Sequence, residues 1–142
     1  MDRDQIACIA ADQPPFAWHL GLRVVSVTPE ELVADLPVSD QLLNRNGTLH
    51  GGAVMGLADN MGGTLTFVNL APGQGTSTIE SKTNFFRPVV AGDTARAVCT
   101  LLHKGRRTVV LQTRILRGDG KLAAQVTQTQ MVVEPGGAGL NP

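Results

Sequence analysis

The residues best suited to chemistry lie between positions 43 and 70, where one acidic side chain, Asp59, interrupts a run of small and apolar residues. At helical spacing, Gly52, Gly56, Asp59 and Gly63 share one face. Each glycine costs a helix roughly 1 kcal/mol relative to alanine, so such a stripe indicates the close approach of another backbone or of a ligand. From this pattern alone, Asp59 is either a base in a crevice or an ordinary solvated or ion-paired residue.

The start of the same segment offers a second chemical feature. We expect one helix from about His50 to Val68, preceded by a polar loop over residues 39–47. The first N–H groups of a helix lack intrahelical partners and carry partial positive charge, which suits a developing oxyanion. The other side of this helix carries an apolar stripe that predicts burial in a core, formed by Val54, Leu57, Ala58, Met61, Leu65 and Val68.

The segments around this helix have the composition and alternation of strands. They cover residues 22–28, 32–38, 76–87, 94–102, 107–117 and 121–133, and residues 4–13 are expected to form a short helix. Pro37 favours an edge position or an early end for the second strand. The order of elements predicts an α+β fold, in which a curved antiparallel sheet wraps around one long central α-helix. We expect a single domain over residues 1–142, with its core at 15–133 and a disordered tail at 134–142.

Composition excludes several classes of protein. No apolar run approaches the roughly 18 residues of a membrane-spanning helix, so no membrane association is expected. The N-terminus lacks the pattern of a secretory signal, and Cys8 and Cys99 form no CxxC pair. A reduced, cytoplasmic location is therefore expected. With four Phe, one Trp and no Tyr, the chain lacks stacking platforms for nucleic acid.

Charge is balanced overall but not along the chain. Residues 1–80 carry three Lys or Arg against nine Asp or Glu, a net of −6, whereas residues 81–142 carry nine against three, a net of +6. The basic residues are either solvated strand faces or a lip for a phosphorylated ligand. As phosphate-binding residues we favour Arg87 and Arg106, with Lys104 as a further candidate; Lys82, Arg107 and Arg114 are also available.

Other catalytic motifs are missing from the sequence. There is no GxGxxG or P-loop pattern for a nucleotide and no GxSxG elbow for a serine nucleophile. His19, His50 and His103 are far apart and have no ligand spacing to a cysteine. We therefore expect neither a metal site nor a separate cofactor.

Three stretches resemble one known family. The first is NRNGTLHGGAVMGLADN, residues 44–60; the second is TIESKTNFFRPVVAGD, residues 78–93; a weaker third is DGKLAAQVTQT, residues 119–129. In this order they resemble the hotdog-fold acyl-CoA thioesterases of the phenylacetate-pathway and 4-hydroxybenzoyl-CoA type. The resemblance spans about residues 15–133. It implies an enzyme that hydrolyses an acyl-CoA to the free acid and coenzyme A.

The resemblance also assigns roles to five residues. It implies that Asp59 is the nucleophile or the general base, and that the Gly51 N–H polarises the thioester carbonyl. His50 would help to shape the site, and Asn44 would orient the carboxylate or water. Thr78 would supply a hydroxyl near the acid, although its neighbours at positions 76 and 77 could serve instead if the strand slips. Without the resemblance, Asn44 reads as a turn residue and Thr78 as an ordinary strand residue.

The spacing of two of these residues adds an inference about assembly. Gly51 and Asp59 are eight residues apart, which is about 12 Å along a helix. A reacting carbonyl needs both groups within roughly 3 Å, so one chain cannot supply both to one thioester. We expect Asp59 and Thr78 of one protomer to face Asn44, His50 and Gly51 of another, in an obligate homodimer. The family resemblance suggests a homotetramer.

Two alternatives to a thioesterase remain open. A hotdog hydratase or dehydratase would use the same acyl-CoA substrates, but its Asp–His pattern is not visible here. A non-enzymatic acyl-CoA-binding protein is the other alternative. The sequence does not rank aromatic, medium-chain or hydroxylated acyl groups; candidates for the pocket lining are Trp18, Met55, Phe67, Phe85 and Phe86.

Overall fold

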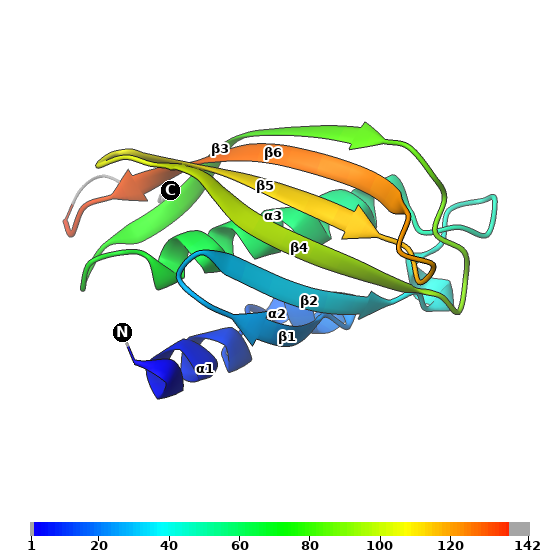
Figure 1. The fold of residues 1–142 in the computed structure, drawn as a ribbon, viewed down its shortest axis with the longest axis horizontal. Coiled ribbons are helices and arrows are strands. Elements are labelled where there is room, and N and C mark those ends of the chain that lie inside the picture. Colours follow the sequence, from blue (N-terminus) through cyan, green and yellow to red (C-terminus); the bar gives the residue numbers. More distant parts are fainter. Residues whose placement is uncertain (1, 137–142) are drawn as a thin grey trace.

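The computed structural model describes residues 2–136 and shows one antiparallel sheet curved around a long helix, α3 (Gly51–Val68) (Figure 1). The sheet contains six strands in the order β1-β2-β4-β5-β6-β3. The strands are β1 (Arg23–Val27), β2 (Glu31–Pro37), β3 (Gly75–Phe85), β4 (Thr94–Lys104), β5 (Thr108–Leu116) and β6 (Leu122–Val133). The predicted α+β fold, with a curved sheet around one central helix, is confirmed.

Helix α3 begins where the sequence predicted. His50 is its N-cap, and the Nδ1 atom of the imidazole accepts a 2.8 Å hydrogen bond from the Gly52 N–H. The helix ends at Asn69, whose side-chain amide donates to the carbonyls of Leu65 and Pro29. These contacts satisfy backbone groups that a helix end otherwise leaves without partners, and they fix both ends of α3 against the loops.

The core lies between α3 and the concave face of the sheet. On the helix, Leu57, Ala58, Met61 and Leu65 are completely buried, as the predicted apolar stripe requires. Buried residues alternate along β2, β4, β5 and most of β6, and they include Leu32, Leu36, Leu111, Ile115 and Val126. Full burial of a large aliphatic side chain stabilises the fold by roughly 1.5–3 kcal/mol, so this interface holds α3 in a fixed orientation.

The N-terminal arm contains two helices rather than one. The expected helix at 4–13 is α1 (Arg3–Ala11), and a second helix, α2 (Pro15–Leu20), follows immediately. Pro15 occupies the first turn of α2, where its missing N–H costs no hydrogen bond. The ring of Phe16 lies over Gly56, where an added Cβ would be 2.8 Å from it. The close approach of α2 therefore explains one glycine of the predicted stripe.

Two further expectations concern Pro37 in β2 and the C-terminal tail. Pro37 is the last residue of β2, so the expected early end of this strand is observed. The alternative, an edge position, is wrong, because β2 pairs with both β1 and β4. A short 3-10 helix, η1 (Asp40–Leu42), lies in the expected loop. Of the tail predicted to be disordered, 134–142, residues 137–142 lie outside the described part of the chain. No helix within residues 2–136 is long and apolar enough to cross a membrane.

Candidate active site

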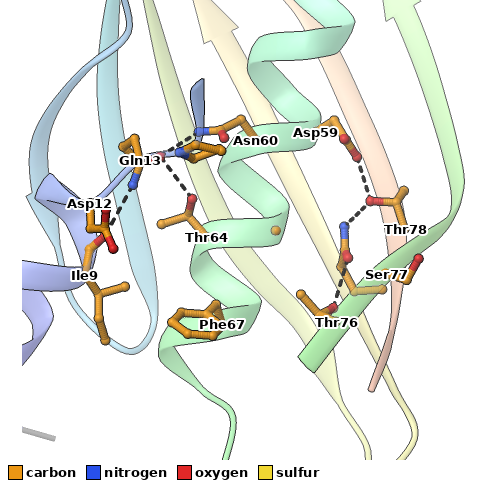
Figure 2. A pocket seen from close by; sticks show the side chains of 13 residues that line it. Ile9, Asp12, Gln13, Asp59, Asn60, Thr64, Phe67, Thr76, Ser77 and Thr78 are labelled. Carbon is orange, nitrogen blue, oxygen red and sulfur yellow. Dashed lines mark hydrogen bonds between the residues drawn. The ribbon is translucent and has the colours of Figure 1, made fainter. Parts of the chain in front are cut away.

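The carboxylate of Asp59 and the hydroxyl of Thr78 are in direct contact. Thr78 Oγ1 donates a 2.7 Å hydrogen bond to Asp59 Oδ1, which joins α3 to β3 (Figure 2). Both residues line a pocket of about 340 Å³ between α3, the start of β3 and the N-terminal arm. Gly63 borders the same pocket, and nothing lies within 4 Å of the position its Cβ would take. Of the predicted glycine stripe, Gly63 thus opens onto the pocket that contains Asp59, whereas Gly56 is covered by Phe16.

A β-bulge places Thr78 opposite the helix. Thr78 pairs with Gln130 of β6, whereas Glu80 pairs with Thr129, so Ile79 is the extra residue. A bulge shifts which side chains point inward, and bulges are common beside active sites. The hydroxyl of Thr76, one of the alternatives to Thr78, donates instead to Gln130 Oε1 at 3.0 Å.

Two buried glutamines complete the surroundings of the acid, and the sequence analysis missed both. Gln130 Nε2 donates to Thr78 Oγ1 at 2.6 Å, and Gln128 Nε2 donates to Asp59 Oδ1 at 3.3 Å. Each glutamine is only 1% exposed. A sequence signal was available, because both lie at inward-facing positions of β6, where apolar residues are expected.

The wall of the pocket opposite β3 comes from the N-terminal arm. Gln13, which is buried, donates to the Ala10 carbonyl at 2.9 Å and accepts from Asn60 Nδ2 at 2.8 Å and Thr64 Oγ1 at 3.2 Å. Figure 2 shows this cluster across the pocket from Asp59. These bonds attach the arm to α3 at the residue after the acid and again about one turn farther along the helix.

The start of α3 presents one backbone donor. The Gly52 N–H is taken by the His50 side chain, and the Ala53 N–H by the His50 carbonyl. Within residues 2–136 the Gly51 N–H has no acceptor. Because His50 Nδ1 accepts a hydrogen bond, the neutral ring carries its hydrogen on Nε2, and the side chain is exposed. The free N–H at Gly51 is the kind of donor that stabilises an oxyanion.

Asn44 organises the loop before the helix. Its Oδ1 accepts from the backbone N–H groups of Asn46 and Thr48, and its Nδ2 donates to Thr48 Oγ1. This is the turn-residue interpretation that the sequence left open. Asn44 and Gly51 nevertheless line the same hollow of about 190 Å³, so the loop amide and the free helix donor share one small depression.

One chain therefore holds the expected site residues in two groups. Asp59 and Thr78 line the larger pocket, and Asn44 and Gly51 line the smaller one. Gly51 begins α3 and Asp59 lies eight residues along it, about 12 Å away by helical rise. No single thioester carbonyl can contact both groups within one protomer.

The basic residues expected to bind phosphate do not come together in one chain. Arg87 lines the hollow at Gly51, and its Nη1 donates to the Leu122 carbonyl at 2.7 Å. Lys104 ends β4 and donates to Asn69 Oδ1, and Arg106 follows in the β4–β5 turn. By strand register, this turn and Arg87 lie at opposite ends of the sheet (Figure 1).

The expected aromatic lining is also divided. Phe67 lines the pocket at Asp59, and Phe85 lies over Gly51, 3.3 Å from where its Cβ would be. Trp18 lines a groove between α1 and β1 instead. Met55 and Phe86 are exposed on the surface of the chain.

Comparison with known proteins identifies the family. Residues 46–124 match the model of the thioesterase superfamily. The acyl-coenzyme A thioesterase PaaI of Escherichia coli (strain K12) is 31% identical over 110 residues, which cover 76% of this chain and 75% of that protein.

Solved structures agree with this match. The structure of the E. coli PaaI protein superposes with a TM-score of 0.84 at 25% identity, covering 92% of this chain and 93% of that one. A mutant thioesterase from Pseudomonas aeruginosa gives a TM-score of 0.82 at 28% identity, with 94% of each chain covered. This chain therefore belongs to the thioesterase superfamily and is a thioester hydrolase with the hotdog fold.

Proposed function

We propose that this protein hydrolyses an acyl-CoA to the free acid and coenzyme A, with Asp59 as the catalytic carboxylate. The contact between Asp59 and Thr78 at the wall of a pocket is the observation that carries the proposal. The similarity to acyl-coenzyme A thioesterase PaaI supports the choice of an acyl-CoA substrate. The reaction needs no separate cofactor, because coenzyme A is part of the substrate.

The proposed reaction uses two groups on opposite sides of the thioester carbonyl. A backbone N–H polarises the carbonyl oxygen and stabilises the negative charge that develops on it. Asp59 takes a proton from a water molecule as the water oxygen attacks the carbonyl carbon. The C–S bond then breaks, and coenzyme A leaves as a thiolate that is protonated by solvent. In the alternative role, Asp59 attacks the carbon itself and water hydrolyses the resulting anhydride.

We further propose that the site is shared between two protomers of a homodimer. Asp59 and Thr78 would come from one protomer, and Gly51, His50 and Asn44 from its partner. The separation of about 12 Å between Gly51 and Asp59 along α3 supports this arrangement, as does the exposure of Asp59 in the single chain. A homotetramer of two such dimers is the assembly that the family resemblance favours.

Arg87 is the basic residue that we prefer as a contact for a phosphate of coenzyme A. Its side chain is exposed at the hollow that Gly51 also lines. Arg106 and Lys104 belong to the opposite end of the sheet and would reach the same coenzyme A only from another protomer. We propose a cytoplasmic location; the free thiols of Cys8 and Cys99 suit a reducing compartment.

The central experiment is an acyl-CoA panel, assayed by the release of free coenzyme A, with wild type and Asp59→Asn. We expect hydrolysis by the wild type and a loss of at least 100-fold in kcat for the variant, because asparagine cannot accept the proton. Retention of wild-type kcat by Asp59→Asn would refute the role of the carboxylate. Acyl-CoA binding without any release of thiol would favour the non-enzymatic binding protein.

Mixing of inactive variants tests the shared site. In a homodimer of Asp59→Asn, every site lacks the carboxylate. In a homodimer of Gly51→Pro, every site lacks the backbone N–H, because proline has none. A mixed dimer places both lesions in one site and leaves the other site intact. We expect up to half of the wild-type activity per mixed dimer. Verified mixed dimers that remain inactive would contradict sharing.

A further inference from the structure

The two buried glutamines of β6 have no role in the reaction as described so far, yet both amides point to the catalytic pair. Gln130 contacts Thr78, and Gln128 contacts Asp59 itself. Polar side chains that are 1% exposed in an apolar core are costly unless they make specific hydrogen bonds. Their contacts with the acid are therefore the feature that needs an explanation.

The ionised carboxylate dictates the direction of every hydrogen bond in this cluster. An Asp59 carboxylate can only accept, so the Thr78 hydroxyl must donate to it. The Thr78 oxygen is then free only to accept, so Gln130 must present its Nε2. This turns Gln130 Oε1 toward Thr76, whose hydroxyl donates to it at 3.0 Å. Thr76, Gln130, Thr78 and Asp59 thus form one directed chain.

Gln128 is fixed by a different constraint. Its Nε2 donates to Asp59, and its Oε1 is buried without a hydrogen-bond partner among residues 2–136. Its side chain occupies the space beside Gly62 of α3, where an added Cβ would come within 2.3 Å of the amide carbon. The glycine at position 62 therefore makes room for the amide. An unpartnered amide oxygen lowers stability, so the contact with Asp59 is not explained by folding alone.

Both donors converge on the same carboxylate oxygen. Asp59 Oδ1 accepts from Thr78 at 2.7 Å and from Gln128 at 3.3 Å. Within the described part of the chain, Oδ2 accepts no hydrogen bond. The two oxygens of the acid are thereby made different: Oδ1 is held by the protein, and Oδ2 is left for the reaction.

We propose that Gln128 and Gln130 are positioning residues for the hydrolysis. Gln128 holds Asp59 Oδ1 directly, and Gln130 holds Thr78 as an obligate donor to the same oxygen. Together they fix the rotation of the carboxylate so that Oδ2 meets the water or the thioester. This inference rests on the proposed function, because it assigns the reactive oxygen of the proposed acid.

Methionine substitutions test the proposal, since methionine resembles glutamine in size and cannot donate from its side chain. We expect Gln128→Met to lower kcat about tenfold or more, from the loss of a hydrogen bond to a charged group, with KM nearly unchanged. The melting temperature should stay the same or rise, because the unpartnered oxygen is removed. Gln125→Met is the matched control: Gln125 lies on β6 but on the opposite, non-core face, and its kcat should equal that of wild type.

A double-mutant cycle separates the two glutamines. Gln130 acts through Thr78, so Gln130→Met should lower kcat several-fold in wild type and have no further effect in Thr78→Val. Gln128 acts on Asp59 directly, so Gln128→Met should lower kcat in both backgrounds. Additive effects of Gln130→Met and Thr78→Val would overturn the directed chain.

The remaining outcomes distinguish this inference from the proposed function. If Asp59→Asn is inactive while Gln128→Met and Gln130→Met keep wild-type kcat, the positioning roles are wrong and the proposed function stands. If the methionine variants lose melting temperature and keep the kcat of the folded fraction, the glutamines are merely structural, and the inference is again wrong. If Asp59→Asn is fully active, the proposed function itself fails.

Discussion

The hydroxyl of Thr78 donates a 2.7 Å hydrogen bond to Oδ1 of Asp59. This bond connects the middle of α3 to the start of β3 at the wall of the pocket, directly before the β-bulge at Ile79. It therefore couples the position of the acid to the register of an edge strand. A shift of β3 by one residue would put Ser77 or Ile79 in the place of Thr78.

Replacement of the Thr78 hydroxyl should lower the rate without unfolding the protein. Hydrogen bonds to charged groups contribute roughly 1.5–3 kcal/mol, so we expect Thr78→Val to lower kcat about 10- to 100-fold. Thr78→Ser keeps the hydroxyl and should retain most of the activity. Steady-state kinetics of both variants check this, and equal losses in the two would assign the effect to packing instead of the hydrogen bond.

Two adjacent glycines of α3 should respond to alanine in opposite directions. A Cβ at Gly62 would overlap the Gln128 side chain, whereas a Cβ at Gly63 meets nothing within 4 Å. Gly63→Ala should therefore stabilise the protein by about 0.5–1 kcal/mol through helix propensity. Gly62→Ala should destabilise it and lower kcat by displacing Gln128. Urea unfolding of the pair measures the difference, and two variants of equal stability would contradict the packing described.

The attachment of the N-terminal arm should depend on Gln13. Gln13→Leu removes the partners of the Asn60 amide and the Thr64 hydroxyl, and buried groups left unpaired cost about 1–3 kcal/mol. We expect the free energy of unfolding, measured in urea, to fall by that amount. Gln41→Leu changes an exposed glutamine and serves as the control. A comparable loss in both variants would show that the attachment contributes little.

Burial of Cys99 should make the stability of the fold depend on alkaline pH. Burial raises the pKa of this thiol from 9.0 to about 12. Above about pH 9 the unfolded chain loses the proton while the folded chain keeps it, so stability falls as pH rises through this window. From pH 8 to pH 10 the wild type should lose about 1 kcal/mol more than Cys99→Val. Urea midpoints at both pH values test this; parallel losses would indicate that Cys99 does not contribute.

Much of the geometry of the candidate site could be predicted from sequence, because Gly51 and Asp59 lie on one strongly patterned helix. The predicted apolar stripe is the buried face of α3, and Asp59 and Gly63 of the predicted glycine stripe line the pocket. The contact with Thr78 followed from a family resemblance and not from the residues themselves. Strand propensity alone would equally have allowed Thr76, because residues 76 and 78 lie on the same face of β3, and only their position along the strand relative to α3 decides which hydroxyl meets the acid.

The glutamines and the second N-terminal helix were missed for physical reasons. Alternation along β6 places Gln128 and Gln130 inward, but a sequence does not show which buried polar groups will find partners. The sequence predicts one N-terminal helix, at 4–13, and no second one, whereas Pro15 begins α2. The aromatic candidates were separated by the fold, because residues such as Trp18 and Phe67 belong to different hollows.

Binding of coenzyme A should distinguish Arg87 from the other basic residues. Its guanidinium is held by the Leu122 carbonyl at the edge of the hollow that contains the free Gly51 N–H. Loss of a charge-assisted contact to phosphate should raise KM for an acyl-CoA about tenfold in Arg87→Ala, with a small change in kcat. An N-acetylcysteamine thioester of the same acid lacks the phosphates, so its kcat/KM should not change. Arg96→Ala, which removes an arginine already paired with Asp35, is the matched control. An equal fall in kcat/KM with both thioesters would mean that Arg87 shapes the hollow and does not bind the phosphates of coenzyme A.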